Sequence, residues 1–168
     1  MRVYVPLTLS GLAAAHGAGE VGPGPLTAYA VTPGLREWYV SDDIEELEYA
    51  ALSRAASASL RMIAGRPDEA RRRVVVAVDV PDGAAVAEPG QVLDASSLGE
   101  VRIRGAVALA EAAAVHVDAD DAEKDVAAAA AALGAADLGD DDAQFTVDGA
   151  DDHELLWFGI QEIPGLIG

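Results

Sequence analysis

Residues 73–80 read Arg-Val-Val-Val-Ala-Val-Asp-Val, and this run constrains the fold more than any other segment. β-branched residues dominate it, and they favour extended strands because their side chains suit a pleated surface. Apolar residues fill successive positions here instead of alternate ones, so both faces of such a strand need to be covered. The segment therefore predicts a central strand of a sheet that is packed on both sides.

A long amphipathic helix is predicted just before this strand, over residues 42–64. Its apolar residues recur at spacings of three and four, as one face of a helix requires. They are Ile44, Leu47, Ala51, Ala55, Ala58 and Met62, widened by Leu52, Ala56, Leu60 and Ile63. Asp42 followed by Glu45 resembles a capping box. Gly65 and Pro67 are typical of the end of a helix.

The other elements follow from shorter patterns. Strands are predicted at residues 2–6, 27–31, 100–107, 112–117 and 144–147, while residues 154–158 favour either a strand or the start of a helix. Helices are predicted from Thr8 or Ser10 to Gly17, from Thr32-Pro33 to Tyr39, and from Asp118 or Asp120 to Gly134. Loops are expected at residues 17–25, 81–99 and 137–142, and Ile163-Pro164 is expected to end regular structure.

Strands separated by helices predict an α/β or α+β fold over residues 1–168, in one domain. We expect a sandwich in which two or three helices cover a mixed sheet, and the tight β-α-β opening makes a ferredoxin-like arrangement one candidate. A chain of 168 residues with 51% hydrophobic residues can bury a core without disulfides or structural metals. Cysteine is absent, which excludes disulfides, thiol nucleophiles and cysteine-ligated metals.

The net charge of −18 comes almost entirely from the second half of the chain. Residues 76–168 contain 3 basic and 20 acidic side chains. Such a surface repels phosphate, so direct binding to nucleic acid or to an anionic membrane is not expected. Solubility alone can explain the charge. The alternatives are an acidic face for a basic protein partner and a mimic of nucleic acid.

Three residues are candidate metal ligands, namely His116, Asp118 and His153. His116 and Asp118 lie on the same side of a strand end that precedes a helix, an edge where α/β proteins often bind ligands. Imidazole and carboxylate groups suit a metal ion, and His153 could complete the site. The simpler interpretation is that His116 merely ends the strand, while Asp118, Asp120 and Asp121 cap the following helix. No His-Glu-x-x-His pair supports the metal, because position 157 is Trp157.

Both tryptophans lie in short aromatic clusters, at Leu35–Tyr39 and Leu155–Phe158. In a chain with only 5% aromatic residues, we expect these clusters to pack into the core, with a partner surface as the alternative. The sequence contains no phosphate-binding loop, no nucleophile elbow and no coherent set of nucleophile, base and orienting group. No cofactor is therefore expected.

Several segments together resemble an actinobacterial protein family of unknown function. They are Arg2-Val-Tyr-Val-Pro6, Val31-Thr-Pro33, Leu35-Arg-Glu-Trp-Tyr39, Glu45-Glu-Leu-Glu-Tyr49, Ala113-Ala-Val-His-Val-Asp118, Asp142-Ala-Gln-Phe145 and His153-Glu-Leu-Leu-Trp157. The resemblance spans nearly the whole chain and implies a bacterial, cytoplasmic protein. It implies no activity, cofactor or catalytic residue.

The preferred hypothesis is a non-catalytic acidic domain of the cytoplasm that acts through contacts with a basic protein. A cytoplasmic location is expected because the first residues lack the apolar run of a secretory signal and no segment is long enough to span a membrane. One alternative is a small metal-dependent enzyme with a site at His116, Asp118 and His153. Another is a homo-oligomeric structural protein.

Overall fold

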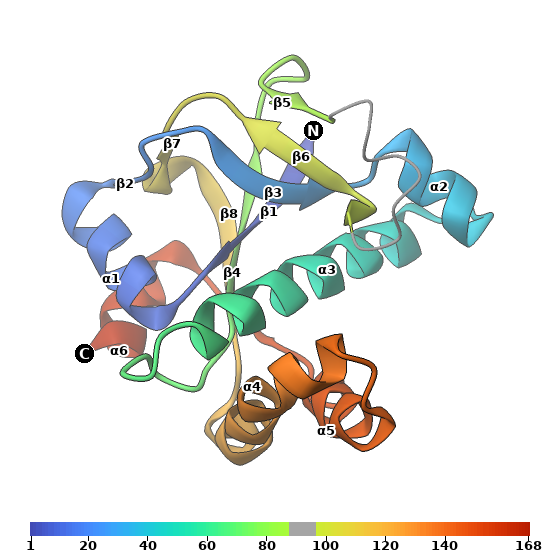
Figure 1. The fold of residues 1–168 in the computed structure, drawn as a ribbon. Helices are drawn as coiled ribbons and strands as arrows, with labels where there is room; N and C mark the ends of the chain where they lie inside the picture. Colours follow the sequence, from blue (N-terminus) through green and yellow to red (C-terminus); the bar gives the residue numbers. More distant parts are fainter. Residues whose placement is uncertain (88–96) are drawn as a thin grey trace.

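The structure is a computed structural model that describes residues 1–87 and 97–168 (Figure 1). The strands are β1 (Arg2–Leu7), β2 (Glu20–Val21), β3 (Leu26–Ala30), β4 (Val74–Asp79), β5 (Ala85–Val86), β6 (Glu100–Ile103), β7 (Val107–Ala108), β8 (Ala112–Val117) and β9 (Leu156–Phe158). The α-helices are α1 (Leu9–Ala18), α2 (Pro33–Tyr39), α3 (Ile44–Ala64), α4 (Glu123–Asp137), α5 (Asp141–Asp151) and α6 (Ile163–Ile167), with short 3₁₀ helices η3 (Leu109–Glu111), η4 (Asp120–Ala122) and η5 (Ile160–Glu162). The predicted α/β class is confirmed.

Seven strands form the main sheet in the order β5-β6-β3-β1-β4-β8-β9. Every pairing of these strands is antiparallel, so the expectation of a mixed sheet was wrong. β4 is central, as its apolar run predicts, and Val74, Val75 and Val76 are fully buried. The pairing of β4 with β1 on one side and β8 on the other aligns Val74 with both Leu7 and Val117.

Helices cover both faces of the sheet. On one face, α1 and α6 pack through Leu12 and Ile163 on valines of β1, β4 and β8. On the other face, α3 crosses the sheet diagonally, with α2 beside its beginning (Figure 1). In the ferredoxin-like arrangement the helices cover one face of an antiparallel sheet, so this fold departs from that candidate.

The predicted long helix corresponds to α3, which begins one residue after its N-cap, Asp43. The Asp43 side chain accepts hydrogen bonds from the backbone of Glu45 and Glu46, as an N-cap should. Ala51 and Ala55 are fully buried on the face of α3 that contacts the sheet, and side chains this small let the helix lie close to the strands. This close approach leaves little room for larger groups beside it.

An α-helical hairpin, α4 followed by α5, packs against the last turns of α3. The prediction of a strand at 144–147 was wrong, because this segment lies inside α5. Asp140 caps α5, and Gly139 adopts the positive φ that reverses the chain between the two helices. Val147 and Ala150, three residues apart, face the core that α5 shares with α4, which is a helical spacing.

Three smaller expectations also need correction. Helix α1 ends at Ala18, with Gly19 as its C-cap, and not at Gly17, and β2 lies within the expected 17–25 loop. β5 lies within the expected 81–99 loop, of which residues 88–96 are outside the described residues. Regular structure continues past Ile163 as α6, because a helix tolerates proline in its first turn.

In the described residues, no helix combines the length and apolar character needed to cross a bilayer.

The aromatic clusters are not core elements. Trp38 is 59% exposed and Trp157 is 63% exposed, whereas Leu35 is the fully buried member of its cluster. The prediction that these clusters pack into the core was therefore wrong for both tryptophans. The physical reason is the alanine-rich face of α3, which closes the core with small side chains and leaves the rings of Trp38 and Trp157 outside it, whereas Phe158 packs partly buried against the opposite face.

Candidate functional site

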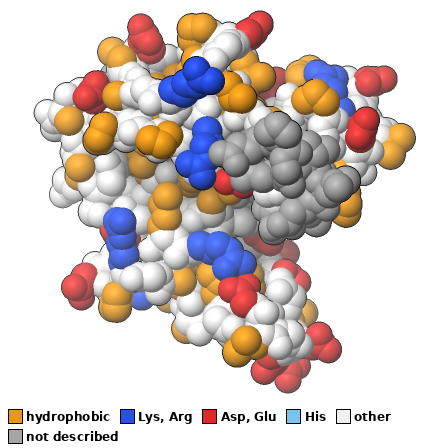
Figure 2. All heavy atoms as spheres, turned by 45° about the horizontal axis from the view of Figure 1, so that its top comes forward, with side chains coloured by type: hydrophobic (Ala, Val, Ile, Leu, Met, Phe, Trp, Pro, Cys, Tyr) orange, Lys and Arg blue, Asp and Glu red, His pale blue; other side chains and the backbone are white. Residues whose placement is uncertain are grey.

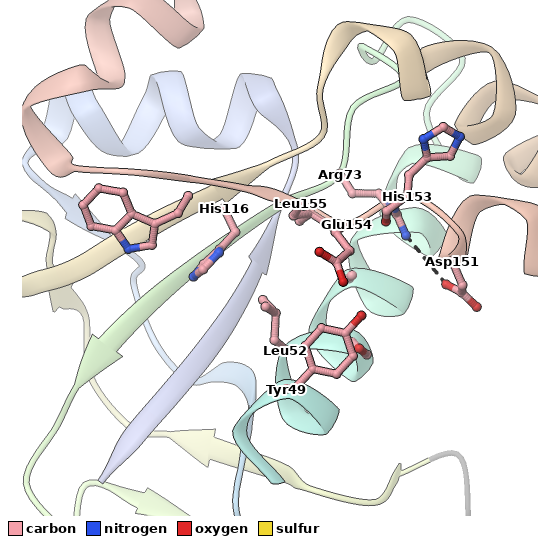
Figure 3. Close-up of a pocket in the computed structure, with 11 residues that line it drawn as sticks. Tyr49, Leu52, Arg73, His116, Asp151, His153, Glu154 and Leu155 are labelled. Carbon is pink, nitrogen blue, oxygen red and sulfur yellow. Dashed lines mark hydrogen bonds and ion pairs between the residues drawn. The ribbon is translucent and has the colours of Figure 1, made fainter. Parts of the chain in front are cut away.

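A groove with two adjoining cavities runs between α3 and the strands β8 and β9 (Figure 3). The cavities have volumes of about 460 and 380 Å³, and both are lined by Tyr49, Leu52, His116 and Trp157. Tyr49 and Leu52 lie one helical turn apart on α3, whereas His116 and Trp157 are cross-strand partners on β8 and β9. The antiparallel pairing of β8 with β9 thus places His116 and Trp157 side by side in the groove.

One end of the groove is fixed by a buried ion pair between Arg73 and Asp118. Arg73 Nε and Nη2 donate to the two carboxylate oxygens at 2.8 and 2.9 Å, and the backbone NH of Arg73 adds a third bond. The Arg73 side chain is 2% exposed and that of Asp118 is fully buried. Arg73 Nη2 also donates to the carbonyls of Ala150 and His153, so this guanidinium ties β4 to the end of α5.

This geometry overturns the capping role expected for Asp118. Both of its carboxylate oxygens are taken by Arg73, and no side chain caps the first residues of η4 or of α4. The register between β4 and β8 explains the result, because aligning Val74 with Val117 places Arg73 beside Asp118. An arginine at the start of an otherwise apolar strand was the one signal of this pair in the sequence.

His116 is half-buried in the floor of the groove. Burial lowers the pKa of its imidazole below the ordinary value, and the positive charge of Arg2 lowers it further. Arg2 itself forms a two-point ion pair with Asp79, at 3.1 and 3.0 Å. The groove therefore contains a neutral imidazole at neutral pH.

His153 lines the same cavity, but its ring turns away from Glu154 and Tyr49 (Figure 3). The ring points toward α4, where Nε2 lies 2.7 Å from Asp125 Oδ2. The described residues contain no group of three or more His, Cys, Asp or Glu side chains placed to hold a metal ion. With Asp118 committed to Arg73, metal binding by His116, Asp118 and His153 stays a prediction without support from this geometry.

Carboxylates surround the groove. Glu154 is exposed and points toward Tyr49 and Leu52 (Figure 3), and Asp151 lies 3.6 Å from Arg73 Nη1. Burial raises the pKa of Asp151, and its acidic neighbours raise it further, while Arg73 opposes them. Glu48 lies at the other cavity, where it accepts a hydrogen bond of 3.1 Å from the hydroxyl of Tyr4.

Tyr49 and Glu48 were not among the candidate residues predicted from the sequence. Tyr49 sits on the outer side of the α3 stripe, and its role depends on β9, more than 100 residues further along the chain. Only the pairing of β8 with β9 brings Trp157 to the same place, and a sequence does not reveal such a pairing directly. The groove is therefore lined by aromatic rings, apolar side chains and carboxylates.

The architecture defines an α/β sandwich protein with an antiparallel seven-stranded sheet. The chain belongs to a family of unknown function (DUF6912), which matches residues 1–167. No curated protein and no solved structure matches the chain significantly. The family assignment therefore adds no activity to what the geometry shows.

Proposed function

We propose that this protein acts by docking a basic partner protein on the α4–α5 hairpin. Residues 120–152 contain 11 acidic side chains, all exposed, and a single basic residue, Lys124. In Figure 2, acidic side chains gather at the lower end of the molecule, over this hairpin. A field of one sign on a projecting element attracts and orients a partner of the opposite sign.

Most of these carboxylates are available to a partner. Asp120, Asp125, Asp137 and Asp151 each lie within 4.0 Å of a cationic or histidine side chain of the same chain. Within residues 1–87 and 97–168, the other seven form no ion pair. A docked lysine or arginine would therefore gain contacts without breaking existing ones.

The observation that carries the proposal is Phe145, which is 81% exposed in the middle of this acidic surface. On α5 it shares a face with Asp141, Asp142 and Asp148, at helical spacings of three and four. Leu138, 90% exposed, lies at the turn just before the helix. Solubility requires charge but not exposed rings, whereas protein interfaces combine an aromatic anchor with a polar rim.

A defined basic peptide tests the proposal. We expect an arginine-rich peptide of about 15 residues to bind the protein in calorimetry, and Phe145→Ala to weaken binding several-fold. The matched control is Trp38→Ala on α2, which removes an exposed ring far from the hairpin (Figure 1). Equal effects of the two variants, or no binding at low salt, would refute docking at the hairpin.

We also propose that the protein works in a bacterial cytoplasm, as its resemblance and composition suggest. An acidic surface is compatible with this setting, because its net charge keeps the protein dispersed and repels anionic membranes and nucleic acids. Fractionation of cells that produce a tagged chain tests this, and recovery in the membrane or extracellular fraction would contradict it.

A further inference from the structure

We propose that the groove between α3 and β9 receives one cationic side chain, an arginine or lysine, of the basic partner. This inference rests on the proposed function and names its recognition element. The groove adjoins the hairpin, since Asp151 at the end of α5 and His153 and Glu154 just after it line the larger cavity. A partner docked on the hairpin can therefore reach the groove without a conformational change.

The charge of the groove favours a cation. Its two arginines, Arg2 and Arg73, are matched by Asp79 and Asp118 in two-point ion pairs. The carboxylates of Glu48 and Glu154 lie outside these pairs, and Asp151 adds a third negative charge, which lies 3.6 Å from Nη1 of the Arg73 side chain that already serves Asp118 as counter-ion. Three negative charges at a partly enclosed site, with little positive charge to offset them, attract an ammonium or guanidinium group.

The same pairing disfavours an anionic ligand. Arg73 Nε and Nη2 already donate to Asp118, Ala150 and His153, and Nη1 lies 3.6 Å from Asp151. A bound phosphate or carboxylate would have to use Nη1, where it would displace Asp151, or break the buried bonds of Nε and Nη2. It would also face the carboxylate of Glu154 (Figure 3).

The shape and lining fit a long basic side chain. Tyr49 and Trp157 are 54% and 63% exposed at the groove, and an aromatic face attracts a cation within about 6 Å. Leu52 and Leu155 offer apolar surface to the methylene stem of an arginine or lysine. His116, kept neutral by its burial, does not repel the charge.

The fluorescence of Trp157, which lines the groove, can report on binding there. In a Trp38→Phe background Trp157 is the one tryptophan left, so its fluorescence reports on the groove. We expect N-acetyl-arginine amide to change this fluorescence saturably in the millimolar range, whereas the neutral isostere N-acetyl-citrulline amide leaves it unchanged. Equal responses to the two probes would overturn the proposal, because they would show an apolar pocket without preference for charge.

Variants of the groove separate this inference from the proposed function. Glu154→Gln and Tyr49→Ala should each weaken binding of the arginine-rich peptide by about three- to thirty-fold, the range of a cation–π or ion-pair contact. Glu37→Gln, an exposed acid on α2, is the matched control and should leave the affinity unchanged. If the peptide binds and Phe145→Ala weakens it while both groove variants bind like wild type, the groove inference fails and hairpin docking stands. If no basic peptide binds, the proposed function fails.

Discussion

Arg73 and Asp118 form a buried ion pair, and this burial determines how much each side chain contributes to the stability of the fold. Charges removed from water are stable only while their partners are present. The guanidinium has four oxygen partners, two from Asp118 just after β8, one from Ala150 in α5 and one from His153 after that helix, so its position fixes one wall of the groove. The pair thus connects the core of the sheet to the candidate docking surface.

Removing one member of this pair should destabilise the protein strongly. Asp118→Asn leaves the Arg73 charge buried without its counter-ion, and we expect a loss of about 3–5 kcal/mol in the free energy of unfolding. The control is Asp137→Asn, which breaks the exposed Arg61–Asp137 pair, also bonded at two points, and should cost far less because water screens these charges. Urea denaturation measures both, and similar losses for the two variants would contradict the burial argument.

His116 should make stability depend on pH. Burial lowers the pKa of its folded form below the ordinary value of 6.5, so the unfolded chain binds the proton first as the pH falls. Its contribution is therefore intact above about pH 6.5 and is lost as the pH falls toward the folded pKa. We expect the wild type to lose more stability than His116→Gln between about pH 7.5 and pH 5.5. Parallel urea midpoints of the two proteins over this range would show that His116 is not responsible.

At the scale of elements, one buried hydroxyl links α3 to the two central strands, in addition to the apolar packing of the helix. Ser59 is fully buried, donates to the carbonyl of Leu7 at 2.7 Å and accepts from the NH of Val74 at 3.0 Å. Leu7 and Val74 are the last cross-strand partners of β1 and β4. The hydroxyl therefore satisfies two backbone groups where the central strands meet the helix.

Ser59→Ala should cost about 1–3 kcal/mol, because it leaves a buried NH and a buried carbonyl without this partner. Ser57→Ala, on the exposed side of the same helix, should change stability by less than about 0.5 kcal/mol. Thermal or chemical unfolding compares the two variants directly. A Ser59→Ala protein as stable as the wild type would show that water or a relaxed backbone replaces the hydroxyl.

The elements that the sequence predicted correctly are those with long, unambiguous patterns. The β-branched run gave β4, and the spacing of three and four gave α3 over more than five turns. The segment of α5 resembles a strand in sequence because Phe145 and Val147 alternate with polar residues. The helical spacing of Val147 and Ala150 becomes visible only with their packing on α4. A four-residue window cannot separate the two periods.

The candidate site was less predictable for a related reason. Its residues come from α3, β8 and β9, and their meeting depends on strand pairings between distant segments. The same pairings join Arg73 to Asp118, where capping had been expected. The acidic second half was plain in the sequence, but its concentration on one hairpin around Phe145 required the fold.

For the whole molecule, charge and shape act together. The sheet and its two covering layers form the body, and the hairpin extends beneath α3 (Figure 1). The acidic side chains of the hairpin and Phe145 are exposed. If the charge served solubility alone, its position on the surface would be unimportant. Docking of a partner instead makes the position decisive, and this difference can be measured.

Two triple variants with equal charge changes test the central claim most directly. Asp141→Asn, Asp148→Asn and Asp152→Asn neutralise the hairpin, and Glu20→Gln, Glu37→Gln and Glu111→Gln neutralise exposed acids elsewhere. Binding of the arginine-rich peptide is measured by calorimetry at low and moderate salt. The account predicts that the hairpin variant binds about tenfold more weakly with a shallower salt dependence, while the other binds like wild type. Equal weakening of both would contradict it, because the acids would then act only through their total charge.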